Sequence, residues 1–254
     1  MIKSNSNHHS YKIAMTLSSA SLVLGIFREI LIIYFIGFTK TNDTLQLYLS
    51  IFYTIGLSID AMRLACLNLY SLLSLRQILL AGSIITLPLA ICIGFIMNYF
   101  SEGLDIKLVF VTMIGGYLNL FAAILITYKQ RNNSFLAAQI INVIPNFILI
   151  PGIIFSELFL KNNLITAMVC LTSFIPIVQC ILLFLIPHHS TDGISDEKIN
   201  LFRSVLIFVR HLTAVIGDQL FQVITRSAFY NYGSGYLTMF SIAVRINLNN
   251  HRSS

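Results

Sequence analysis

Four stretches of this chain carry no charged residue over a length that can cross a lipid bilayer. They cover residues 77–101, 108–128, 132–156 and 162–191. A transmembrane helix needs about 20 mainly apolar residues, and each stretch supplies that number. The stretches are continuously apolar and do not alternate with polar residues, which excludes membrane β-strands. The sequence therefore predicts an integral membrane protein built from helices.

The overall composition agrees with a location inside a membrane. Only 10% of the 254 residues are charged and 56% are hydrophobic, whereas a soluble domain carries about 25% charged residues. This excludes a soluble enzyme, a nucleic-acid-binding module and a disulfide-stapled secreted domain. The four cysteines lie in apolar runs without a C-x-x-C spacing, so we interpret them as small buried hydrophobic residues. We expect no cofactor, no metal and no covalent catalysis.

Four further segments are apolar but interrupted by charges: residues 13–37, 44–70, 200–229 and the segment from about 235 to 245. Together with the uncharged stretches they predict an all-α polytopic bundle of about eight transmembrane helices. We divide the chain into a cytoplasmic tail (1–12), a six-helix N-terminal lobe (13–187), a cytoplasmic linker (188–199) and two helices of an incomplete second lobe (200–254). His188 and His189 lie near acidic residues in the linker, and a solvated loop explains them better than a metal site.

The distribution of lysine and arginine favours a cytoplasmic N-terminus. With that orientation the inside connectors carry Lys3, Lys12, Arg76, Lys129, Arg131 and Lys198, and the outside connectors carry Lys40, Lys107 and Lys161. Positively charged loops remain in the cytoplasm. We therefore expect a multi-pass membrane protein with a cytoplasmic N-terminus, in which the excess of six positive charges sets topology and meets anionic lipids.

Ionisable side chains inside membrane spans are costly and are functional candidates by default. They occur in three predicted helices, at Arg28, Glu29, Asp60, Arg63, Arg203, Arg210, Asp218 and Arg226. Asp60 and Arg63 lie three residues apart on one helical face, so mutual neutralisation is an alternative to a functional role. Arg203 is also explained by snorkelling at a helix end.

The kind of charged residue indicates the kind of ligand. Every ionisable residue that we assign to the interior of a span is Arg, Asp or Glu, and none is Lys. Guanidinium groups match phosphate geometry better than ammonium groups do. A cavity lined by such residues favours a phosphate or pyrophosphate ligand.

A polar stripe interrupts the stretch 132–156. Gln139, Asn142 and Asn146 follow a helical spacing beside Pro145. Hydrogen bonding between helices is the simplest explanation of such a stripe in a membrane bundle.

Two short motifs resemble the MurJ (MviN) lipid II flippases. The first is Ser21-Leu22-Val23-Leu24-Gly25-Ile26-Phe27-Arg28-Glu29, followed by Gly37 and Asn42-Asp43; it keeps the serine, Leu-Gly, Arg-Glu and loop aspartate of the family pattern. Leu22 stands where the family has another arginine, and Thr44-Leu45 stands where the family has Ala-Phe. The second motif is Ile224-Thr225-Arg226-Ser227-Ala228, followed by Ala243-Val244-Arg245-Ile246. Arg63 lies two turns after the place of the family's second-helix arginine.

The resemblance implies a transporter of a bacterial inner membrane that moves a lipid-linked pyrophosphate glycan, such as lipid II, between the leaflets during cell-wall synthesis. Among our candidate substrate-binding residues, the matched motifs contain Arg28, Glu29, Asp43, Arg226 and Arg245, and the resemblance implies that Arg28 and Arg245 meet the pyrophosphate. Arg63, Arg210 and Asp218 are candidates because they are ionisable residues inside predicted spans. Family members have fourteen helices, so it also implies a truncated member that is inactive alone, or that associates with a second copy or a full-length homologue. A polysaccharide repeat-unit flippase and a non-transporting membrane fragment remain the alternatives.

Overall fold

The computed structural model describes residues 3–69, 75–101, 103–131, 135–160, 163–185 and 201–243. Within these ranges the chain forms long helices and no strand, as the uncharged stretches predict. The helices are α1 (Lys3–Ile36), α2 (Lys40–Leu69), α3 (Leu75–Phe100), α4 (Ile106–Arg131), α5 (Phe135–Phe159), α6 (Leu164–Leu185) and α7 (Leu201–Tyr232). A short helical segment follows at residues 236–243.

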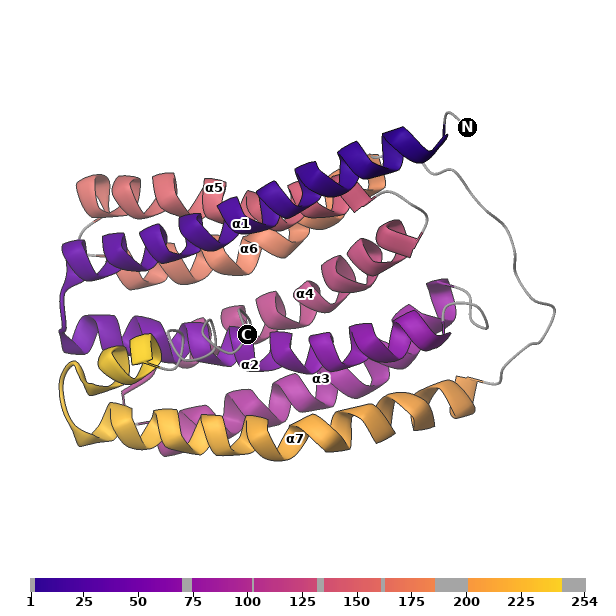
Figure 1. Cartoon of the computed structure of the whole chain (residues 1–254). Coiled ribbons are helices and arrows are strands. Elements are labelled where there is room, and N and C mark those ends of the chain that lie inside the picture. Colours follow the sequence, from indigo (N-terminus) through magenta and orange to yellow (C-terminus); the bar gives the residue numbers. More distant parts are fainter. Residues whose placement is uncertain are drawn as a thin grey trace.

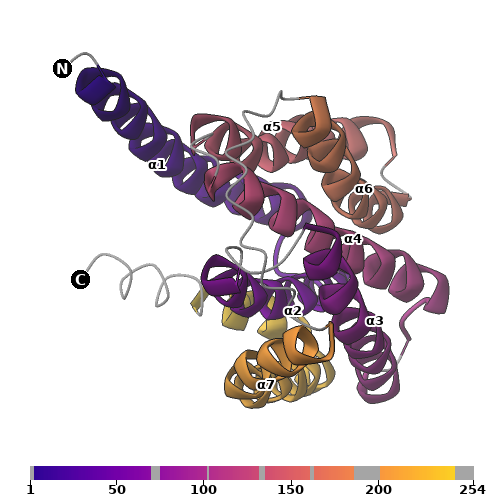
Figure 2. The same cartoon turned by 90° about the vertical axis from the view of Figure 1, so that its right-hand side faces the viewer.

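The helices run roughly along one direction in two groups with α4 between them (Figure 1). One group contains α1, α5 and α6, and the other contains α2, α3 and α7. The central helix α4 packs against α2, α3, α5 and α6. Figure 2 shows that the N-terminal half of α1 extends away from the other helices.

Among the described residues, four helices are long and apolar enough to cross a membrane by length and composition: Met15–Ile36, Leu75–Phe100, Ile106–Gln130 and Leu164–Leu185. A shorter apolar helix covers Val143–Phe159. Large apolar side chains are exposed along the outer faces of α1, α3, α5 and α7, as expected for surfaces that face lipid and not water. The protein is an all-α membrane helical bundle. The predicted number of eight spans stays a prediction.

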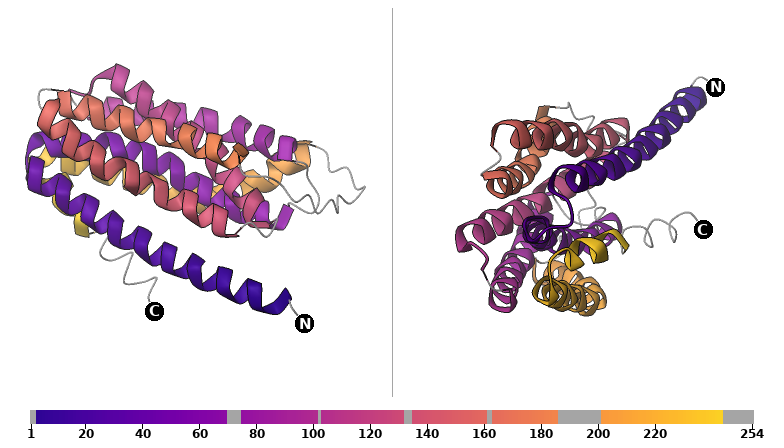
Figure 3. Two further views of the ribbon diagram at one scale, coloured as in Figure 1. Left: turned by 90° about the horizontal axis from the view of Figure 1, so that it is seen from above. Right: turned by 90° about the vertical axis from the view of Figure 1, so that its left-hand side faces the viewer.

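The position of α7 bears on the predicted division into lobes. This helix packs against α2 and α3 (Figure 3), and its Ser227 hydroxyl lies 3.4 Å from the Ser101 hydroxyl at the end of α3. Within the described residues, α7 is therefore packed as part of the same bundle as the first six helices. The linker 188–199 and the last eleven residues lie outside the described part, so the incomplete second lobe stays a prediction.

Small residues allow α4 to lie close to its neighbours. A Cβ atom added at Gly115 would lie 2.6 Å from the Cα of Ser173 on α6, and one added at Gly116 would lie 2.9 Å from Ile55 on α2. Close approach at small residues is a common basis of helix association in membranes. The two neighbouring glycines explain how one helix packs against both groups.

Candidate anion-binding site

The two charged residues that the sequence places inside the first span form an ion pair in the structure. On α1, the Arg28 guanidinium donates to Glu29 Oε1 through Nη2 at 2.8 Å and through Nε at 3.3 Å. Both side chains are only 15% exposed. Residues Met15–Ile36 of α1 are long and apolar enough to cross a membrane, and in such a span the pair reduces the cost of holding an arginine.

Two other helices contribute polar groups to the same place. Arg28 Nη1 donates to Asn146 Oδ1 of α5 at 3.3 Å, and Asn146 Nδ2 donates to the Ser21 carbonyl oxygen of α1 at 3.0 Å. Tyr53 of α2 also interacts with the Arg28 side chain. The predicted hydrogen bonding between helices is thus confirmed for Asn146, whereas the side chains of Gln139 and Asn142 lie outside the described residues.

Pro145, next to Asn146, leaves a backbone carbonyl of α5 without its helical hydrogen bond. Pro145 lacks an N–H group, so it leaves the carbonyl four residues earlier, that of Ile141, without its helical hydrogen bond. Gln179 of α6 donates to this carbonyl through Nε2 at 3.2 Å. The side chain of Gln179 is buried. It therefore satisfies a carbonyl that lies about one helical turn before Asn146, and it links α5 to α6 there.

The carboxylate of Asp43 is buried and accepts hydrogen bonds from other residues of the protein. Its side chain is completely buried. Oδ2 accepts the Gly235 N–H at 2.6 Å, and Oδ1 accepts the Thr238 N–H at 2.9 Å and the Thr238 hydroxyl at 2.7 Å. These bonds cap the first turn of the helical segment 236–243. The structure gives Asp43 a structural role, and its predicted substrate contact stays a prediction.

Asp43 belongs to a set of contacts that joins the corner between α1 and α2 to the end of α7. Lys40 Nζ donates to the Tyr230 carbonyl at 2.7 Å and lies 3.4 Å from the centre of the Tyr230 ring. Asn42 donates to the carbonyl of Gly37, which has φ +72°. Asn231 donates to the Phe100 carbonyl at 2.6 Å. The ends of α1, α3 and α7 therefore lie together at one end of the bundle.

The two described candidates on α7, Arg210 and Arg226, lie outside the Arg28 cluster, because among the described residues α7 does not pack against α1. Arg226 is half-buried on α7 and lies 3.5 Å from Gln222 Oε1. Arg210 is exposed on the same helix. The side chains of Arg63, Asp218 and Arg245 lie outside the described residues, as does the predicted Asp60–Arg63 pair.

Lys129 belongs to α4 and not to the connector after it. Lys129 is in the last turn of α4 and is only 2% exposed. From the sequence we predict a connector at this residue, because it follows directly on an uncharged stretch. A cation in the last turn of a helix interacts favourably with the helix dipole, which is the one sequence signal that favours its inclusion in α4.

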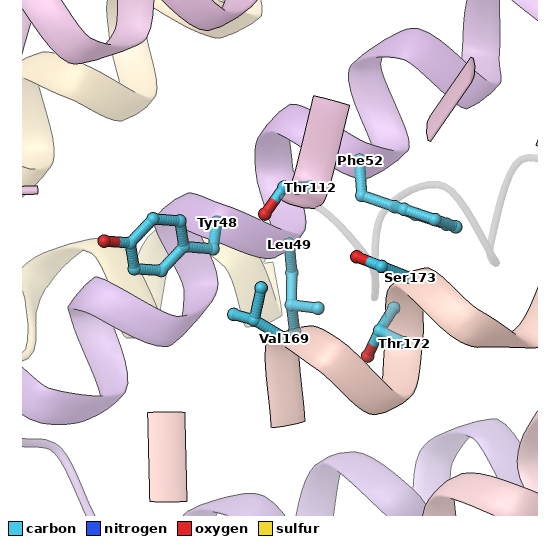
Figure 4. A pocket seen from close by; sticks show the side chains of 7 residues that line it. All are labelled: Tyr48, Leu49, Phe52, Thr112, Val169, Thr172 and Ser173. Atoms are coloured by element: carbon cyan, nitrogen blue, oxygen red, sulfur yellow. The ribbon is translucent and has the colours of Figure 1, made fainter. Parts of the chain in front are cut away.

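A small gap between α2, α4 and α6 does not resemble an anion site. Figure 4 shows its lining, which contains no charged side chain: Tyr48, Leu49, Phe52, Thr112, Val169, Thr172 and Ser173. The described residues also contain no group of three or more His, Cys, Asp or Glu side chains that could hold a metal ion. The Arg28 cluster is the stronger candidate, because it combines a guanidinium with polar groups from three helices.

The fold and the cluster define the class of the protein: a helical membrane bundle with a charged, hydrogen-bonded group inside its first span. No protein-family model matches the chain, and no curated protein or solved structure matches it.

Proposed function

We propose that the protein is a membrane transporter of the MurJ type, which binds a lipid-linked pyrophosphate glycan and moves it between leaflets. The observation that carries this proposal is the Arg28 guanidinium. It is largely buried in an apolar span, where it is held by Glu29, Asn146 and Tyr53. An arginine inside a membrane helix costs up to about 3 kcal/mol on insertion scales. Glu29 and Asn146 offset that cost, and the guanidinium geometry suits a phosphate ligand.

The hydrogen-bond lengths support an exchangeable partner. Two of the three bonds that Arg28 makes to Glu29 and Asn146 are 3.3 Å long, whereas bonds from a guanidinium to an anion are about 2.8 Å. A phosphate oxygen in the place of the Asn146 oxygen gains a shorter, charge-assisted bond. Glu29 neutralises Arg28 while no ligand is bound and gives up part of that contact when pyrophosphate arrives.

The proposal also includes the orientation of the chain. The predicted inside connectors carry more lysine and arginine than the outside ones, which supports a cytoplasmic N-terminus in a bacterial inner membrane. In that orientation α1 spans the membrane and Arg28 lies within the span. The lipid tail of the substrate stays in the bilayer beside α1. No bond of the substrate is made or broken.

Native mass spectrometry of the purified chain tests the proposal with three probes: lipid II, undecaprenyl pyrophosphate and undecaprenol. We expect binding of the first two and little binding of the uncharged alcohol. Arg28→Ala lowers the affinity for both pyrophosphates about tenfold or more, since a charged hydrogen bond contributes about 1.5–3 kcal/mol. Arg28→Lys retains part of the binding because the charge remains and the two-pronged geometry is lost.

Two variants make the result specific. Glu29→Gln is expected to retain or strengthen pyrophosphate binding, because it removes the carboxylate that competes for Arg28. Arg76→Ala is the matched control, since Arg76 is exposed at the start of α3. Equal pyrophosphate binding by the wild type and Arg28→Ala would remove Arg28 from the site and, with it, the observation on which the function rests.

A further inference from the structure

The exposed tyrosines gather at one end of the bundle. Among the tyrosines whose side chains are described, only Tyr34, Tyr99, Tyr232 and Tyr236 are exposed, and the first three are 78%, 82% and 78% exposed. Tyr34 and Tyr99 lie in the last turns of α1 and α3, and Tyr232 ends α7. Tyr236 opens the short segment 236–243 and packs edge-on against Tyr232.

Hydrogen bonds show that these helix ends share one level. Asn231 of α7 donates to the Phe100 carbonyl at the end of α3. Asp43 accepts from Gly235, just after α7, and lies close to the end of α1 in the chain. The tyrosines therefore form one band around the bundle and do not arise from a single helix.

The length of the exposed apolar face of α3 gives the distance from this band to the other side of the bundle. Its exposed apolar side chains follow one face: Leu80, Ile84, Leu87, Ile91 and Phe95, with Tyr99 next. From Leu80 to Tyr99 the helix rises about 28 Å at about 1.5 Å per residue, which equals the thickness of a bilayer's hydrocarbon core, about 30 Å. The exposed Arg76 follows one turn beyond Leu80.

We propose that Tyr34, Tyr99, Tyr232 and Tyr236 form an interfacial anchor that holds this end of the bundle in the lipid headgroup layer. A tyrosine ring is apolar and its hydroxyl is polar, so it suits the boundary between acyl chains and headgroups. The chain contains no tryptophan, so tyrosine alone supplies the aromatic band at this end. The exposed Lys107, in the first turn of α4, follows the connector from the end of α3.

The anchor fixes the depth of the charged residues. Arg28 lies about 9 Å below Tyr34 along α1, inside the hydrocarbon layer. Arg210 lies about 33 Å from Tyr232 along α7, at the opposite boundary together with Arg76. The exposed Arg210 is thus positioned to reach headgroups by snorkelling, whereas Arg28 is too deep for that without its polar partners.

The missing tryptophan also provides the experiment. Single variants Tyr34→Trp, Tyr99→Trp and Tyr232→Trp each place one tryptophan in the full chain, which is then reconstituted into phosphatidylcholine vesicles. Half of the lipid carries bromine either near the headgroup or near the end of the acyl chain. Leu87→Trp is the matched control, because it lies on the same exposed face of α3 near the middle of the predicted span.

We expect the shallow bromines to quench the fluorescence of the three Tyr→Trp variants more than the deep ones do. The order is reversed for Leu87→Trp. The three Tyr→Trp variants replace one aromatic side chain by another at exposed sites, so we expect them to retain the fold. Stronger quenching by the deep bromines than by the shallow ones at positions 34, 99 and 232 would overturn the anchor. No lipid quenching at these positions while Leu87→Trp is quenched would also overturn it. Absence of quenching at all four positions would also overturn it, since the band would then not face lipid.

Discussion

Asp43 connects the beginning of α2 to a segment that lies 192 residues later in the chain. Both of its carboxylate oxygens accept hydrogen bonds from the first turn of residues 236–243, and the side chain is completely buried. A buried donor that loses its acceptor costs about 1–3 kcal/mol. The carboxylate therefore contributes more to the stability of this end of the bundle than a surface cap would.

The residue-scale prediction concerns Asp43→Ala, which removes both acceptor atoms. We expect a loss of about 2 kcal/mol in the unfolding free energy and faster amide hydrogen exchange at Gly235 and Thr238. Hydrogen exchange followed by mass spectrometry measures the local effect. Thr41→Ala is the control, because Thr41 is exposed in the same turn. Unchanged protection of residues 235–241 in Asp43→Ala would contradict the structural role.

The sequence does not reveal which residue on another helix will be the hydrogen-bond partner of a buried polar side chain. The helical spacing predicted that Asn146 bonds to another helix, and it does so through Ser21 and Arg28. The pattern contained no information about which helix would be met, because that depends on how α1 packs against α5. Asp43 was assigned to a ligand since nothing local indicates that its acceptor atoms are used by Gly235 and Thr238.

At the scale of elements, uninterrupted apolar stretches predicted helices well. The stretch 77–101 corresponds to α3 (Leu75–Phe100), and 108–128 lies within α4 (Ile106–Arg131). Hydrophobic length is sufficient for this because backbone groups in a membrane must be paired within the helix. Helix ends were less predictable, as Lys129 shows: a charge adjoining an apolar stretch did not end the helix.

The proline in α5 gives the element-scale prediction, tested by a double-mutant cycle. Gln179→Leu leaves the Ile141 carbonyl unpaired and is expected to cost about 1 kcal/mol. In the background Pro145→Ala, the alanine N–H bonds this carbonyl itself, so Gln179→Leu should then cost much less. Unfolding free energies of the four proteins in bicelles give the coupling. Additive effects would show that Gln179 does not serve the carbonyl freed by Pro145.

At the scale of the whole molecule, the apolar outer faces of the bundle agree with a membrane location. They do not by themselves give an orientation, which in our account depends on the loop charges. Substituted-cysteine labelling in cells tests it. The proposed topology places Ser195→Cys in the cytoplasm and Lys107→Cys, at the start of α4, in the periplasm. An impermeant thiol reagent should therefore label only Lys107→Cys; labelling of Ser195→Cys alone would invert the topology.

The central claim is that the interior face of α1 around Arg28 binds a lipid-linked pyrophosphate. Leu24 lies one turn before Arg28 on the same face, whereas Ile30 is exposed on the opposite face. Photo-crosslinking compares Leu24→p-benzoylphenylalanine with Ile30→p-benzoylphenylalanine in membranes that contain radiolabelled lipid II. The account predicts a lipid II adduct at position 24 that disappears with Arg28→Ala, and none at position 30. Equal adducts at both positions, or an adduct at position 24 that persists without Arg28, would contradict it.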